Sequence, residues 1–148
     1  MADDSVPVAV PQHIWLVGGA AMLWGLYGLV NYVMVQVKIA QYMAGKSADD
    51  LANFIGPSIL SHAMWLIMIF AMLSGAVLLL MHRRHAVLAF WVTFLAMLGM
   101  RAENLVLFGL DFFYAYSVNA LIFIGLSFAI IIGLIVYSSR MKARGVLH

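Results

Sequence analysis

Long uncharged runs, separated by short charged segments, dominate the pattern of this chain. Residues 5–37, 51–81 and 112–139 contain no Asp, Glu, Lys or Arg. Each run exceeds the roughly 20 apolar residues that a helix needs to cross a bilayer. A fourth run, 86–110, is interrupted by only two charged residues. We therefore predict a single membrane domain (1–148) with four spans, at about 13–37, 58–81, 85–108 and 112–138.

The spans are expected to be helices, because a lipid-facing backbone must satisfy its own hydrogen bonds. Strands of a membrane barrel would alternate in hydrophobicity over about ten residues, and residues 121–136 do not. The predicted fold class is all-α, an integral membrane four-helix bundle. Between the first two spans, Ser47 with Asp50 fits a helix N-cap followed by an acid. A short interfacial helix is therefore expected at about 47–56.

The composition excludes several classes of protein. Hydrophobic residues make up 66% of the chain and charged residues only 9%, whereas soluble domains have about 25% charged residues. Eight Lys and Arg residues against six Asp and Glu are too few for a nucleic-acid surface. The chain has no cysteine, so thiol chemistry and disulfides are excluded. The expected partners are the lipid bilayer and other integral membrane proteins, or copies of this chain.

Basic residues between and beyond the spans set the expected orientation. Cytoplasmic loops are enriched in Lys and Arg. With four spans, both termini and the second loop share one side, and that side is expected to be cytoplasmic. It holds Arg83, Arg84, Arg140, Lys142 and Arg144, whereas the opposite side holds Lys38, Lys46 and Arg101.

Small residues at helical spacing mark the expected helix contacts, because lipid supplies no hydrophobic drive between membrane helices. Three of the four spans carry such a face, which could pack within one bundle or against a neighbouring protein. The faces are Gly18, Ala21, Gly25 and Gly28 on the first span, Ala71 and Gly75 on the second, and Gly125, Ala129 and Gly133 on the fourth.

Polar residues gather at one depth, toward the side opposite the termini. Every span contributes to this layer, and the other halves of the spans are almost entirely apolar. Polar groups inside a span usually face the protein interior and often mark a functional site. We predict a binding or partner-contact layer of Asn31, Tyr32, Gln36, His62, Arg101, Glu103, Asn104 and Asn119.

The two charges of the third span, Arg101 and Glu103, are predicted to point in different directions. Residues two apart on a helix do not face each other. If one faces the bundle interior, the other is expected to face outward, toward a second protein or protomer. The alternative is that both are solvated charges that end the span near the membrane surface.

No motif for catalysis is present. The sequence lacks HExxH, GxSxG, P-loop and glycine-rich dinucleotide patterns, so we expect no enzyme and no catalytic residue. No metal site is predicted either. His13 and His85 lie at similar depth and leave open a haem or other pigment. The His-Arg-Arg-His turn at 82–85 is more typical of a cytoplasmic anchor.

The first span and the loop after it carry a more specific pattern. Residues 24–32, Trp-Gly-Leu-Tyr-Gly-Leu-Val-Asn-Tyr, are followed by Gln36 and by Tyr-Met-Ala-Gly at 42–45. With the closing residues 140–145, this pattern resembles a family of small four-span proteobacterial membrane proteins that often carry the label "sugar transporter". The resemblance implies a bacterial inner-membrane location. Asn31 replaces the Asp usual in that family and cannot titrate, so it does not support proton coupling.

Three functions are consistent with the sequence. The first is a non-catalytic accessory or scaffold subunit of a larger membrane complex, or a self-assembling bundle. It is favoured by the small-residue faces and by the apolar midplane. The second is a small-solute, sugar-like transporter or binding protein that acts as an oligomer. The third is a b-type haem or pigment protein.

Overall fold

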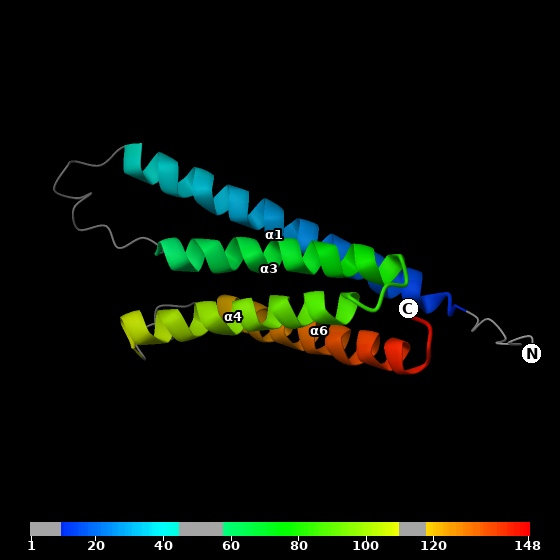
Figure 1. Cartoon of the computed structure of the whole chain (residues 1–148). Coiled ribbons are helices and arrows are strands. Elements are labelled where there is room, and N and C mark those ends of the chain that lie inside the picture. Colours follow the sequence, from blue (N-terminus) through cyan, green and yellow to red (C-terminus); the bar gives the residue numbers. More distant parts are fainter. Residues whose placement is uncertain (1–9, 45–57, 110–117) are drawn as a thin grey trace, which may run out of the picture.

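The computed structural model describes residues 10–44, 58–109 and 118–148 (Figure 1). These residues form four helices and no strand, which confirms the all-α four-helix bundle. Each helix contains a segment long and apolar enough to span a membrane. The helices are α1 (His13–Ala44), α3 (Ile59–Leu80), α4 (Ala86–Phe108) and α6 (Val118–Ala143).

Two helices extend beyond the predicted spans. Helix α1 continues past residue 37 to Ala44, and α6 continues past residue 138 to Ala143. The last turn of α6 carries Arg140 and Lys142, whose charges are favourable near the negative end of a helix dipole. The interfacial helix expected at 47–56 and the first residues of the fourth span lie outside the described residues.

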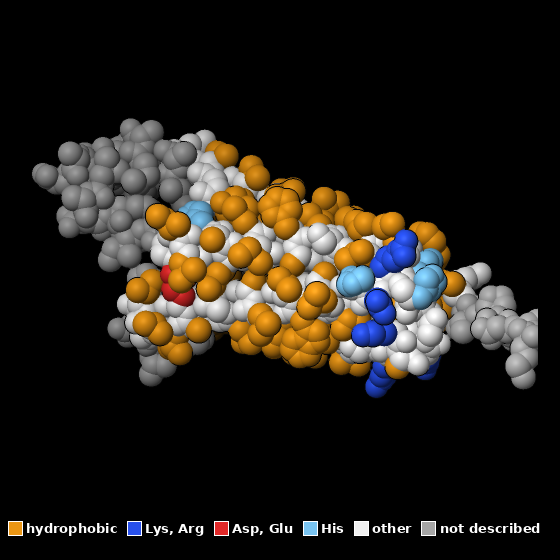
Figure 2. All heavy atoms as spheres, in the orientation of Figure 1, with side chains coloured by type: hydrophobic (Ala, Val, Ile, Leu, Met, Phe, Trp, Pro, Cys, Tyr) orange, Lys and Arg blue, Asp and Glu red, His pale blue; other side chains and the backbone are white. Residues whose placement is uncertain are grey.

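The helices pack in chain order. Helix α1 packs on α3, α3 on α4, and α4 on α6, with the α3–α4 contact the most extensive. The turn between α3 and α4 lies at the same end of the bundle as the start of α1 and the C-terminus in Figure 1. We call this the basic end, because Lys, Arg and His side chains gather there in Figure 2 while the middle of the molecule is apolar.

Close helix contacts explain the small residues of α1 and α3. A Cβ atom added to Gly18 would lie 2.5 Å from Leu80 Cδ2, and one added to Gly75 would lie 2.7 Å from Phe90 Cε1. Side chains of neighbouring helices therefore occupy the space that a larger residue would need. These two predicted packing faces are used within the chain.

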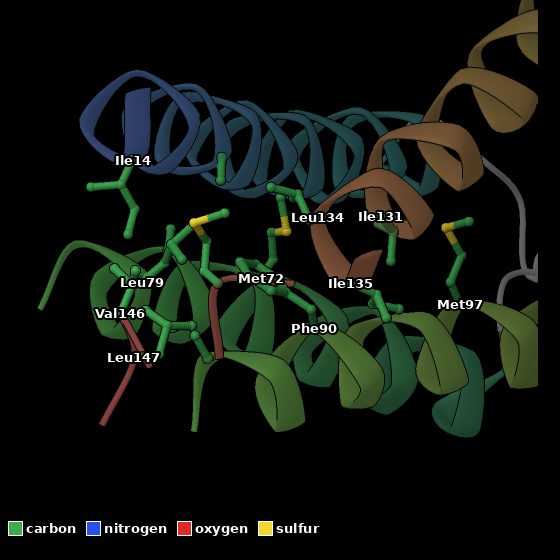
Figure 3. Packing of buried hydrophobic residues seen from close by; sticks show 14 residues of the cluster. Ile14, Met72, Leu79, Phe90, Met97, Ile131, Leu134, Ile135, Val146 and Leu147 are labelled. Carbon is green, nitrogen blue, oxygen red and sulfur yellow. The ribbon is translucent and has the colours of Figure 1, made fainter. Parts of the chain in front are cut away.

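The small-residue face of α6 is not used in this way. Of the two uses expected for it, packing within the bundle and contact with a neighbouring protein, the first is not seen among the described residues. A Cβ atom at Gly125 or Gly133 would meet none of their atoms within 4 Å. Helix α6 contributes Ile131, Leu134 and Ile135 to the core instead (Figure 3). Both glycines are exposed, and Gly133 lines a second pocket together with Ala21 and Trp24 of α1.

The core is tightest at the basic end, where the chain folds back after α6. Gly145 has a φ of 73°, and the amide of Val146 donates to the carbonyl of Met141. This is a Schellman-type helix end, which favours glycine at the left-handed position. Val146 and Leu147 are consequently buried with Ile14 (Figure 3).

Helix α1 separates from α3 toward the end opposite the basic end, as Figure 1 shows. The nearest α3 atom to an added Cβ is 2.5 Å away at Gly18 and 2.7 Å away at Gly25, but 3.8 Å away at Gly28. The divergence of α1 opens the space that forms the candidate site.

Candidate functional site: a pocket between four helices

A pocket of about 570 Å³ lies between the helices, from the middle of the bundle toward the end opposite the basic end. All four helices contribute to its wall. Small-molecule sites in proteins commonly occupy about 300–1,000 Å³ and are mostly apolar with a few polar groups. The size and the mixed lining of this pocket fit that class of site.

The polar mouth of the pocket is formed by Asn31 of α1, Ser61 of α3, and Arg101 and Asn104 of α4. Within residues 10–44, 58–109 and 118–148, Arg101 is the one charged side chain in the lining. It is half-buried, and its Nε atom is buried without a hydrogen-bond partner in this part of the chain. A guanidinium offers five donors and no acceptor, so this end of the pocket presents hydrogen-bond donors and positive charge.

The floor of the pocket is apolar. Met72 of α3, Met97 of α4 and Ile131 of α6 line it, and all three side chains are buried. Figure 3 shows them in the space enclosed by the four helices. Methionine adapts its shape to irregular gaps, so this floor is suited to an apolar group rather than to a polar one.

Two hydroxyl groups in the wall are already satisfied by their own helices. Thr93 Oγ1 donates to the carbonyl of Ala89 at 3.0 Å, and Ser127 Oγ donates to the carbonyl of Phe123 at 2.8 Å. Such bonds to the preceding turn are the usual solution for Ser and Thr inside a helix. These hydroxyls therefore do not require a polar partner from within the pocket.

Aromatic side chains close the pocket between α1 and α6. The indole of Trp24 stacks on the ring of Phe123 with centroids 5.5 Å apart, and Tyr27 lies 5.8 Å from the same ring. All three residues line the pocket. Tyr27 is 52% exposed and Phe123 exceeds a third. We call these three residues the aromatic seam, because their rings contact one another across α1 and α6.

Glu103 lies beside the pocket in a second polar cluster. Its carboxylate accepts hydrogen bonds from Ser58 Oγ and, at 2.7 Å, from Ser61 Oγ. Ser58 also caps α3, because its Oγ accepts from the amide of Ser61 at 2.9 Å. Hydrogen bonds to an ionised group are stronger than neutral ones, so this cluster fastens α4 to the start of α3.

The expectation that either Arg101 or Glu103 faces outward is therefore wrong. Helix α4 has protein on two sides, since it contacts both α3 and α6. Arg101 lines the pocket, and Glu103 contacts α3 on another face of the same helix. The two residues point about 200° apart around the helix axis. Both can still face protein, because α4 has a neighbouring helix on two sides.

His62 extends the cluster toward α1. Its Nδ1 lies 2.9 Å from the carbonyl oxygen of Ser58, which can only accept, so Nδ1 carries a proton. Its Nε2 lies 3.4 Å from the amide oxygen Oε1 of Gln36. Tyr32 meets the imidazole edge-on at 6.2 Å.

The predicted polar layer thus divides into two groups. Asn31, Arg101 and Asn104 meet at the pocket mouth, whereas Tyr32, Gln36, His62 and Glu103 belong to the cluster of α1, α3 and α4. Asn119 lies at the start of α6, and its side chain is outside the described residues.

Sequence reasoning missed most of the lining. Met68, Met72 and Phe123 carry no sequence signal of a pocket. Trp24 and Tyr27 stand out in the sequence only as part of the family pattern at residues 24–32. Apolar lining residues cannot be distinguished from core residues by spacing, because both recur at helical intervals.

The two histidines considered for haem occupy different settings. His13 Nδ1 lies 2.6 Å from the hydroxyl of Tyr137 on α6. His85 precedes α4 with an exposed side chain. Across residues 10–44, 58–109 and 118–148, no group of three or more His, Cys, Asp or Glu residues is placed to hold a metal ion. The positions of these histidines give no support to paired axial ligation.

Comparisons with known proteins identify no relative: no protein-family model, curated protein or solved structure matches the chain.

Proposed function

We propose that this protein binds a small molecule in the pocket between its four helices, as a binding or transport protein of a bacterial inner membrane. The observation that carries the proposal is the pocket of about 570 Å³, with polar groups converging at one end. Sequence reasoning favoured an accessory subunit because it found no internal site. The pocket favours the binding alternative, since a purely structural bundle gains nothing from a cavity of this size.

The position of the pocket supports a role in binding from or across the membrane. It begins near the middle of the spans, around Thr93 and Ile131, and continues toward the end opposite the basic end. Membrane transporters commonly bind their substrates near the bilayer midplane. With the basic end cytoplasmic, as its Lys and Arg residues favour, the pocket mouth lies toward the periplasm.

Filling the pocket tests the proposal. Gly28 lines the pocket, and a Cβ atom there would meet only Ile69 Cγ1, at 3.8 Å. Gly19 lies on the same helix outside the pocket lining, with open space at its Cβ position. We expect wild-type protein purified from its native membrane to retain a small molecule detectable by native mass spectrometry. Gly28→Leu should lose it, and Gly19→Leu should keep it.

The same extraction has a clear contrary result. If wild-type protein and Gly28→Leu yield identical small-molecule spectra while both variants unfold at the wild-type temperature, the pocket is not a binding site. Gly28→Ala provides a check on folding, because its single added carbon fits at van der Waals distance. It should retain most of the bound molecule.

A second candidate function is that of a scaffold subunit, which the open face of α6 favours. Gly125 and Gly133 have no neighbour within 4 Å of a Cβ position, and small residues are suited to close helix contacts in membranes. If a partner helix docks there, Gly125→Leu should abolish a complex seen on a native gel without changing the folding of the chain. An unchanged complex, or none in wild type, would count against this candidate.

A further inference from the structure

We infer that the ligand of the pocket is an apolar anion: a molecule with one acidic group bound by Arg101 and an apolar body about 12 Å long. This inference rests on the proposed function and specifies the chemical class of its ligand. It is argued from the charge of the lining, the polarity along the pocket, and the route by which the pocket is reached.

The charge of the lining is the first argument. Among the residues that the structure describes, Arg101 is the one charged residue that lines the pocket. Glu103 is the one acidic residue in the described part of the chain, and it lines the cluster with Ser58 and Ser61 rather than the pocket. Buried charges in a membrane are costly unless they are paired. An acidic group in the pocket mouth would supply the pair, with the bidentate geometry that a guanidinium favours.

The neighbours of Arg101 reinforce this preference. Asn31 and Asn104 line the same end of the pocket, and their side-chain amides can donate hydrogen bonds without adding negative charge. Arg101 Nε is buried, and no described residue forms a hydrogen bond with it. The mouth thus offers several donors that converge near a single positive charge, as recognition of a carboxylate or similar group requires.

The polarity of the pocket then defines the rest of the ligand. From Arg101 to Thr93, two lining residues of α4, the helix rises about 12 Å at 1.5 Å per residue. Over this length the wall changes from amides and a guanidinium to methionine and isoleucine side chains. The hydroxyl of Thr93 is committed to its own helix. A polyhydroxylated sugar would leave its hydroxyls unsatisfied against this floor, which is expensive, whereas an acyl chain or an aromatic body would not.

The aromatic seam indicates the route of entry. The three residues of the aromatic seam line the pocket. They belong to α1 and α6, whose backbones are not in extensive contact. Tyr27 and Phe123 are exposed toward the exterior of the bundle. An amphiphile dissolved in the bilayer can therefore reach the pocket by displacing side chains alone. A ligand with an apolar body would also be concentrated in the surrounding lipid.

Two matched pairs of probes test the inference. Protein in zwitterionic lipid nanodiscs is titrated with radiolabelled decanoate or 4-phenylbutyrate, and bound label is measured by scintillation proximity. Unlabelled decanol and 4-phenylbutanol serve as uncharged competitors. We expect the acids to bind at least tenfold more tightly than the matching alcohols. Preference for decanoate would indicate a lipid-derived ligand, and preference for 4-phenylbutyrate an aromatic acid; either supports the inference.

Variants assign the preference to Arg101. Arg101→Gln should weaken binding of the acids at least tenfold and leave the alcohols unchanged, whereas Arg101→Lys should retain part of the preference. Lys38→Gln removes an exposed charge that does not line the pocket and should have no effect. Unchanged thermal unfolding of each variant excludes loss of the fold as the cause.

The outcomes separate this inference from the proposed function. Equal binding of acids and alcohols, abolished for both by Gly28→Leu, would overturn the inference and leave the pocket as a binding site. Absence of probe binding, together with a neutral molecule retained in a Gly28-dependent manner from native membranes, would also overturn it. Loss of every Gly28-dependent signal would overturn the proposed function itself.

Discussion

Gly75→Leu is expected to separate α3 from α4 and to destabilise the protein more than any other single exchange of a glycine. An added Cβ atom would lie 2.7 Å from Cε1 and 2.9 Å from Cδ1 of Phe90. The ring of Phe90 is fully buried, so a shift away from the added side chain would displace neighbouring core groups. Overpacking of a dense core costs about 1–3 kcal/mol and sometimes more. We expect a loss of about 3 kcal/mol, measured by unfolding in mixed detergent and SDS.

A reciprocal substitution tests the mechanism of this loss. Phe90→Ala alone should cost about 3 kcal/mol or more, because it opens a large cavity. The double variant Gly75→Leu with Phe90→Ala should be more stable than the sum of the two losses predicts, since the leucine occupies part of that cavity. Gly19→Leu is the control in open space. If Gly75→Leu is no more harmful than Gly19→Leu, the packing of α3 on α4 described above is wrong.

The spans could be predicted from the sequence because hydrocarbon thickness sets a strict minimum on helix length. The faces that the helices present to one another could be predicted only in part. Gly18 and Gly75 are in close contact with a neighbouring helix, whereas Gly125 has the same spacing signal and no neighbour. In a membrane, lipid-facing and protein-facing positions are both apolar, so periodicity does not reveal which face meets a partner.

The sequence does not give the order of the helices in space, and that order decides what the two charged residues of α4 face. Arg101 and Glu103 point in different directions, as their spacing predicts, but both directions lead into protein because α4 lies between α3 and α6. The pocket depends on the same information. Met72, Thr93 and Ile131 come from three helices, and no local pattern indicates that their side chains share one cavity.

The pair α3 and α4 is held at both ends by different forces. Near the basic end a short turn joins the helices, and Phe90 fills the space beside Gly75. At the far end, where no connecting turn is present, Glu103 binds Ser58 and Ser61. The polar cluster therefore holds α3 and α4 together at the pocket mouth, and close packing holds them together near the turn. Because Ser61 also lines the pocket, the stability of this cluster and the shape of the mouth are linked.

Glu103→Leu is expected to be the most damaging change in the polar cluster. It removes the acceptor of two serine hydroxyls, and it leaves Ser58 to cap α3 without its partner. Hydrogen bonds to a charged group contribute about 1.5–3 kcal/mol each, but those between membrane helices are often weaker. We expect a loss of about 2–4 kcal/mol in the free energy of unfolding, measured in lipid nanodiscs.

The conservative variant Glu103→Gln distinguishes hydrogen bonding from simple filling of space. Its amide oxygen can accept from one serine, and its NH₂ group can donate to the hydroxyl oxygen of the other. We expect it to lose about 1 kcal/mol, less than half the loss in Glu103→Leu. Adding Ser61→Ala to Glu103→Leu should then recover stability, because the buried hydroxyl of Ser61 is removed together with its acceptor, while Ser58 still caps α3. If glutamine and leucine are equally harmful, or the added alanine brings no recovery, the carboxylate does not fasten α4 to α3 through these serines.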